Sequence, residues 1–116
     1  MRVTRFAEAP TYHPPLHRGV KARRLQGLEA GPTARFWTGL SVYAPGGAAE
    51  ESPTAEETVY TVIDGELVVR CDGREETLRE LDSAHLPKGA VRSVENCSGA
   101  SATLLVVIAL PQETQG

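Results

Sequence analysis

The sequence predicts an all-β fold, a barrel or sandwich of short antiparallel strands with little or no helix. β-Branched and apolar residues recur in short runs between Val59 and Leu110, and turn residues separate the runs. Asp-Gly pairs at residues 64–65 and 72–73 are typical of two-residue hairpin turns, because glycine accepts the positive φ of a type I′ turn. No stretch combines a helical apolar period with capping residues. Many short strands at this spacing indicate a sandwich or a barrel.

The bulk properties limit the class of protein. The 116 residues suffice for one domain with one core, and 41% of them are hydrophobic, an ordinary globular share. A net charge of −3 gives no reason to expect a nucleic-acid or anionic-membrane partner, since both favour basic patches. No apolar run is long enough for a membrane span, and the N-terminus has no signal-peptide hydrophobic region. We therefore expect a cytoplasmic protein, with Cys71 and Cys97 as reduced thiols.

Residues 1–20 are expected to form an N-terminal arm or edge segment. Pro10, Pro14 and Pro15 fix φ and remove backbone donors, which excludes a helix here. His13 and His17 have the spacing of a metal-ligand pair, but the prolines between them exclude the helix that would align them. We interpret the segment as an arm that packs on the barrel or on a neighbouring subunit.

Residues 21–110 are expected to form the barrel, followed by a polar, frayed tail from Pro111 to Gly116. Trp37 and Tyr43 share one face of a strand over 34–43, but the pattern does not decide which face is inside. Glycine, proline and acidic residues over 44–57 predict a long irregular connection. The expected strands are residues 21–27, 34–43, 59–63, 66–71, 75–81, 84–86, 91–96 and 103–110.

Two stretches resemble the sequence motifs of the cupin family. The first motif, G-x5-H-x-H-x3-4-E-x6-G, closes on Gly65, and the second, G-x5-P-x-G-x2-H-x3-N, matches Pro87, Gly89 and Asn96. Leu81 stands where the second motif begins with glycine. The resemblance covers roughly residues 36–110 and implies a single antiparallel jelly-roll β-barrel.

The metal-binding positions of these motifs depart from the family pattern. Arg92 stands at the histidine of the second motif, and Thr58 at the glutamate of the first, with Glu57 one residue earlier. The other two histidine positions fall on Glu51 and Pro53, or on Ser52 and Thr54. Threonine and proline are poor ligands, and a guanidinium repels cations. We expect no metal cofactor; the alternative is an atypical site in which His85 joins Glu51 or Glu57.

Arg92 is the leading candidate for ligand binding. At a position that points into a cupin barrel, its guanidinium would bind a carboxylate or phosphate. Thr58 and Tyr60 share a strand face and would be its hydrogen-bonding neighbours, with Glu51 and His85 as further candidates. In the alternative, Arg92 neutralises Glu51 or Glu57 within the protein. His85 is either a pocket acid or base, or a structural histidine.

Three functions are compatible with these residues. The one we favour is a metal-independent protein that binds a small organic anion against Arg92. The second is a metal-free isomerase, epimerase or lyase with His85 and Tyr60 as acid and base. The third is a dioxygenase or decarboxylase with an unusual metal site. Because small cupins commonly pair through sheet edges and N-terminal strands, we also expect a homodimer.

Overall fold

The computed structural model describes residues 1–112 and confirms the expected all-β fold. Within that range the only helical segments are two single turns of 3-10 helix, η1 (Phe6–Glu8) and η2 (Leu28–Ala30). The strands are β1 (Thr11–Tyr12), β2 (His17–Gln26), β3 (Phe36–Pro53), β4 (Thr58–Asp64), β5 (Leu67–Cys71), β6 (Arg74–Leu78), β7 (Ser83–Leu86), β8 (Val91–Glu95) and β9 (Ala102–Ala109). The six strands from β4 to β9 lie where the sequence predicts them, apart from small differences at their ends.

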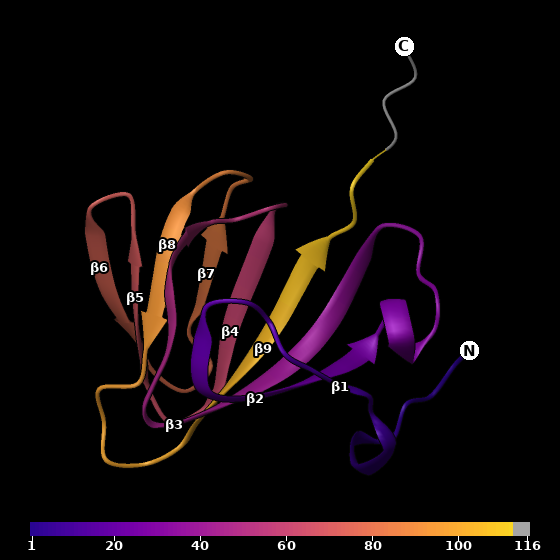
Figure 1. Cartoon of the computed structure of the whole chain (residues 1–116), viewed down its shortest axis with the longest axis horizontal. Coiled ribbons are helices and arrows are strands. Elements are labelled where there is room, and N and C mark those ends of the chain that lie inside the picture. The colour runs from indigo at the N-terminus through magenta and orange to yellow at the C-terminus, as the bar shows by residue number, and fades with distance from the viewer. Residues whose placement is uncertain (113–116) are drawn as a thin grey trace.

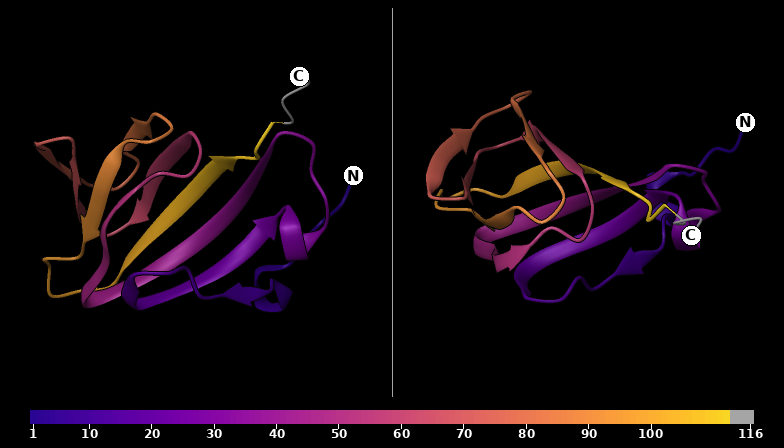
Figure 2. Two further views of the ribbon diagram at one scale, coloured as in Figure 1. Left: turned by 45° about the horizontal axis from the view of Figure 1, so that its top comes forward. Right: turned by 90° about the horizontal axis from the view of Figure 1, so that it is seen from above.

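The strands form one antiparallel sheet that folds over into the two layers of a jelly-roll barrel (Figures 1 and 2). The hydrogen-bonded order is β6-β5-β8-β3-β9-β4-β7, and β2 pairs with β3 along its length. The first half of β3 pairs with β9, whereas its last residues pair with β8. Strand β3 therefore belongs to both layers and joins them.

Glycines allow β3 to pass from one layer to the other. A Cβ at Gly47 would lie 2.5 Å from the carbonyl oxygen of Gly19 on β2, so only glycine fits at this contact. Gly46 beside it has a φ of +79°. The irregular connection predicted for residues 44–57 is thus wrong over most of its length, because β2 and β8 pair with the backbone as far as Pro53.

Only one of the two predicted Asp-Gly hairpins exists. Asp72 and Gly73 both have positive φ, and the strands they join pair through Cys71 and Arg74, as in a type I′ hairpin. The chain at Gly65 instead leaves β4, which pairs with β7 and β9, for β5, which pairs with β6 and β8. The turn at Gly65 therefore connects the two layers, and the hairpin predicted there is wrong.

The N-terminal segment packs along the barrel. Strand β2 begins at His17, inside the segment expected to be an arm, because its first residues pair with Ala48 and Ala49 of β3. The short β1 pairs with β2, with Tyr12 opposite Ala22. Residues 13–16 connect β1 to β2, and His13, Pro14 and Pro15 of this connection line the cavity at the end of the barrel.

The core lies between the two layers. Val62, Leu67, Val94 and Leu104 are essentially inaccessible to water, and each contributes about 1.5–3 kcal/mol relative to an exposed side chain. Tyr43 is equally buried, so the face it shares with Trp37 is the inner one.

Asn96, a match to the second motif, holds the β8–β9 connection to β3. Its fully buried side-chain nitrogen donates to the carbonyls of Tyr43 and Ala100 at 3.0 and 2.8 Å. Its oxygen accepts from the backbone N–H and the hydroxyl of Ser98. Every hydrogen-bonding atom of the Asn96 amide group is therefore used within the protein.

The corner from Pro87 to Gly89, the other match, is fixed by Thr54. The Thr54 hydroxyl donates to the Pro87 carbonyl at 2.7 Å, and the Gly89 N–H donates to the Thr54 carbonyl at 2.9 Å. We refer to Asn96 and this corner together as the frame, because both fix connections between strands.

Among residues 1–112, no helix is long and apolar enough to cross a membrane. Cys71 and Cys97 are both free thiols. Of the predicted tail, Pro111 and Gln112 lie outside any strand, and residues 113–116 lie outside the described residues.

Candidate functional site

The barrel contains a cavity of about 290 Å³, called the inner cavity here, at the end covered by the N-terminal segment. This volume is at the lower limit of ligand sites, which span about 300–1,000 Å³, and suits one small ring. Its lining residues come from six segments of the chain: Tyr12, His13, Pro14, Pro15, His17, Arg24, Trp37, Ser41, Tyr43, Tyr60, Arg92, Leu104, Val106 and Ile108. Within the described chain, no aspartate or glutamate lines this cavity.

Arg92 on β8 extends into the inner cavity and is held at three points. Its Nε donates to the Tyr60 hydroxyl at 3.0 Å, and its Nη1 donates to the Glu50 carbonyl at 3.0 Å and the Ser52 hydroxyl at 3.1 Å. All three acceptors are uncharged. No carboxylate of the described residues forms an ion pair with Arg92, and its Nη2 makes no hydrogen bond within them. The guanidinium thus keeps its charge and one donor nitrogen available.

Two tyrosine side chains lie close to this guanidinium. Burial raises the pKa of Tyr60, while the positive charge and hydrogen bond of Arg92 oppose the rise. Burial likewise raises the pKa of Tyr43; the neighbouring Tyr60 raises it further, and the positive charge of Arg92 opposes the rise. Both phenols therefore keep their protons near neutral pH. Because the Tyr60 oxygen already accepts from Arg92, its own O–H remains a donor.

The N-terminal segment brings a histidine to the same cavity. The Nδ1 of His17 lies 2.8 Å from the carbonyl oxygen of Pro15, and a carbonyl can only accept, so the proton sits on Nδ1. Burial lowers the pKa of His17, the hydrogen bond to Pro15 partly opposes this, and the charge of Arg92 lowers it further. His17 is therefore predominantly neutral at pH 7, with Nε2 as an acceptor.

Aromatic rings and a second arginine form the rim of the inner cavity. Tyr12 and Trp37 meet edge to face, with ring centroids 5.7 Å apart. The guanidinium of Arg24 lies 3.6 Å from the Tyr12 centroid and 4.2 Å from that of Trp37. Its Nε donates to exposed Glu29 at 2.8 Å, so the charge of Arg24 is already compensated. Gly39 makes room for these groups, because a Cβ there would lie about 3 Å from both aromatic side chains.

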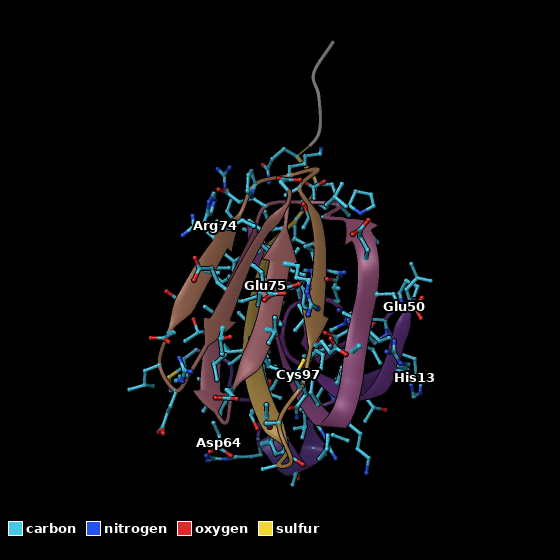
Figure 3. All side chains as sticks on the ribbon, turned by 90° about the vertical axis from the view of Figure 1, so that its left-hand side faces the viewer. His13, Glu50, Asp64, Arg74, Glu75 and Cys97 are labelled. Atoms are coloured by element: carbon cyan, nitrogen blue, oxygen red, sulfur yellow. The ribbon has the colours of Figure 1, made fainter. Side chains whose placement is uncertain are left out.

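A second, larger cleft of about 550 Å³, called the seam cleft, lies between β6 and β7, the two ends of the sheet order. Its lining includes Glu76, Asp82 and His85. His85 points away from the core and lies 2.6 Å from Glu57, with both side chains more than half exposed. Figure 3 shows Arg74, another lining residue of this cleft, on the opposite flank of the molecule from His13 of the inner cavity.

The structure brings together only some of the residues expected to form the site. Arg92 and Tyr60 are in direct contact in the inner cavity. Thr58 is buried, but its hydroxyl donates to the Glu56 carbonyl and does not line the cavity. Glu51 lies on the surface in a shallow depression beside Arg70. His85 lines the seam cleft and not the inner cavity, and it is exposed because it lies between the inward-facing Ala84 and Leu86 on β7.

The structure also bears on the two alternatives for the motif positions, an internal ion pair of Arg92 and a metal site. The alternative in which Arg92 neutralises Glu51 or Glu57 is wrong, since Glu57 is bonded to His85 and neither carboxylate lies within 4.0 Å of the guanidinium. For a cupin metal, the side chains at the motif positions do not fit: Ser52 and Arg92 hydrogen-bond to each other there. In the part of the chain that the structure describes, no group of three or more His, Cys, Asp or Glu residues could hold a metal ion.

Sequence reasoning missed several residues of the inner cavity. Tyr43, Ser41 and Trp37 were recognisable as one strand face, but their period of two cannot tell the inside from the outside. The spacing of His17 from His13 was noticeable in the sequence, but we interpreted the segment that contains both as an arm. Its place beside Arg92 depends on β2 pairing with the far end of β3, which no local pattern specifies.

Comparison with known proteins agrees with this architecture. A family model described as "Cupin domain" matches residues 39–108. The chain is 58% identical over 111 residues to a Mycobacterium tuberculosis protein named "Beta-D-galactosidase Rv1717", covering 96% of both chains.

Solved structures give the same fold. An RmlC-like cupin from Shewanella frigidimarina has a TM-score of 0.79 at 15% identity, covering 97% of this chain and 94% of its own. The polyketide cyclase RemF from Streptomyces resistomycificus has a TM-score of 0.81 at 18% identity, covering 94% and 79%. A predicted oxalate decarboxylase from Thermotoga maritima has a TM-score of 0.78 at 23% identity, covering 96% and 100%. The family match, the high identity to one relative and the shared barrel show that this chain belongs to the cupin family.

Proposed function

We propose that this cupin binds a β-D-galactoside in the inner cavity and hydrolyses it. The observation that carries the proposal is the composition of that cavity, with aromatic rings at its rim and hydrogen-bond donors at its floor. The activity named for the 58% identical relative selects the galactoside among small ring-shaped ligands. Identity over nearly the whole of both chains makes a shared substrate class the simplest expectation.

The shape of the inner cavity suits one sugar ring. Trp37 and Tyr12 offer flat apolar surfaces for the C–H face of the ring. Tyr43, Tyr60 and Arg92 offer donors for its oxygen atoms. A volume of about 290 Å³ admits a monosaccharide unit, and the exposed Glu29 beside Arg24 indicates that the rim reaches solvent, where the aglycone would extend.

The chemistry would differ from that of most glycosidases. These enzymes use two carboxylates, which the described lining of the inner cavity lacks. In our proposal, the Tyr60 hydroxyl gives its proton to the leaving oxygen as the C1–O bond breaks. Arg92 stabilises the resulting phenolate through its Nε hydrogen bond. The Nε2 of His17 takes a proton from a water whose oxygen bonds to C1, so that water is added across the glycosidic bond. The proton on His17 then returns through water to the Tyr60 phenolate, which restores both groups for the next turnover.

The first experiment measures release of nitrophenol from nitrophenyl β-D-galactopyranoside by purified protein, with the β-D-glucopyranoside and the α-D-galactopyranoside as matched controls. We expect turnover of the β-galactoside and at least tenfold less of the other two. Absence of turnover by freshly purified, folded protein at any pH between about 5 and 9 would contradict the proposed hydrolysis.

The seam cleft is the alternative location, because Glu76 and Asp82 place two carboxylates in its lining. Glu76 is paired with Arg74, and Asp82 accepts the backbone N–H of Arg79, so both groups already have partners. We therefore prefer the inner cavity, where Arg92 and the two tyrosine hydroxyls are available.

We further propose that the protein is a cytoplasmic homodimer that needs no metal for this activity. Light scattering at micromolar concentration should give twice the chain mass of 12.4 kDa. A monomer mass would count against the dimer. Activity that disappears with a chelator and returns with one added metal ion would count against metal independence.

A further inference from the structure

We propose that the sugar unit bound in the inner cavity carries a carboxylate, so that the preferred substrates are β-D-galacturonides. Arg92 and Tyr43, at the floor of the cavity beside Tyr60, form the subsite for that carboxylate. This inference rests on the proposed function and specifies which galactosides the site accepts.

The charge balance of the cavity is the first argument. Arg24 and Arg92 are its two permanent cations, and only Arg24 has a carboxylate partner, Glu29 at 2.8 Å. No carboxylate of the described chain lines the cavity or pairs with Arg92. A partly buried guanidinium without a counter-charge is costly unless something else supplies it. A neutral galactoside would leave this charge uncompensated, whereas a galacturonide would neutralise it.

The arrangement of donors is the second argument. Tyr60, Glu50 and Ser52 hold the guanidinium through Nε and Nη1, which fixes its plane and leaves Nη2 unused. A group held in this way is ready for a ligand, because little rotamer entropy is lost on binding. Guanidinium groups bind carboxylates more strongly than hydroxyls, since the hydrogen bond is charge-assisted.

Tyr43 completes the subsite, while Tyr60 holds Arg92 in place and keeps its own O–H for the glycosidic oxygen. Tyr43 and Tyr60 both lie in the electrostatic neighbourhood of Arg92, and both keep their protons at neutral pH. A carboxylate has about four lone-pair positions, and the N–H groups of the unused Arg92 Nη2 together with the Tyr43 O–H can satisfy up to three of them. A sugar hydroxyl offers fewer acceptor positions than a carboxylate, so some of these donors would be left without an acceptor.

The experiment is calorimetric titration of the purified protein with D-galacturonate and with D-galactose, near pH 7, where the acid is ionised. We expect about 10- to 100-fold tighter binding of D-galacturonate. Arg92→Gln should abolish this preference, and Arg35→Gln should retain it, because the Arg35 side chain is exposed, does not line the cavity and bonds to Gln112. Tyr43→Phe should reduce the preference several-fold.

The outcomes separate this inference from the proposed function. Equal binding of the two sugars by the wild-type protein, or a preference that survives in Arg92→Gln, overturns the inference alone. The wild-type comparison is informative even if Arg92→Gln fails to fold. Binding of neither sugar, together with no hydrolysis of nitrophenyl β-D-galactopyranoside or of its galacturonide, overturns both. Faster hydrolysis of the galacturonide supports both.

Discussion

The frame and the inner cavity use polar groups in opposite ways. At the frame, each polar atom of the Asn96 amide is bonded to the protein, and Thr54 satisfies the corner at Gly89. In the inner cavity, Arg92 retains an unused nitrogen, and the hydroxyl protons of Tyr43 and Tyr60 have no partner in the described chain. Polar groups whose hydrogen bonds are all made within the protein stabilise the fold, whereas groups with an unused hydrogen-bond donor are available to a ligand. We therefore expect the frame to determine stability, and the unused groups are those on which the proposed binding depends.

The largest effect is expected at the frame, for Asn96→Ala. The substitution removes the hydrogen bonds to Ser98 and takes the Asn96 donor away from the carbonyls of Tyr43 and Ala100, of which Ala100 keeps the Ser98 hydroxyl within reach. We expect a loss of about 3–5 kcal/mol in the free energy of unfolding, measured by denaturant titration. Ser98→Ala, which spares Asn96, should cost about 1 kcal/mol. A cost below about 0.5 kcal/mol for Asn96→Ala would remove the distinction between the two regions.

A smaller stability effect is expected for Arg92→Ala. The three hydrogen-bond partners of Arg92 are neutral, and water can replace some of the hydrogen bonds that they lose. We therefore expect the free energy of unfolding to fall by about 1–2 kcal/mol. Ligand binding should fall about 10- to 100-fold. The effect of adding Glu51→Gln should be additive, because the two side chains do not interact. A loss of 3–5 kcal/mol that the double mutant restores would instead identify Arg92 as part of a structural ion pair.

The smallest effect concerns pH and His17. Its pKa in the folded protein lies below the ordinary value of 6.5, so the unfolded chain binds protons more readily. The stability contributed by the neutral imidazole is complete above pH 6.5 and is lost as the pH falls toward the folded pKa. The melting temperature should therefore drop more between about pH 7.5 and 5.5 in the wild type than in His17→Gln. Identical pH profiles would show that His17 titrates as freely in the folded protein as in the unfolded chain.

The sequence predicted the frame better than the inner cavity, for a physical reason. Gly89 and Asn96 serve local geometry, a turn and a short loop, so their residue types identify them directly. Arg92 and Tyr60 could be assigned to the cavity because the motif spacing places them on inward strand faces. His17 and Tyr43 could not, because they reach Arg92 only through the bent β3 and its pairing with β2. His85 was misplaced because one step along β7 exchanges the inner and outer faces.

The central claim, that the sugar binds and reacts in the inner cavity, is tested most directly by galactoside hydrolysis in Tyr60→Phe and Glu76→Gln. Tyr60→Phe removes one hydroxyl from the inner cavity, and Glu76→Gln removes one carboxylate from the seam cleft. The account predicts a fall in kcat of about 100-fold or more for Tyr60→Phe, and a change of less than about twofold for Glu76→Gln. Full activity in Tyr60→Phe together with an inactive, folded Glu76→Gln would contradict it and place the reaction in the seam cleft.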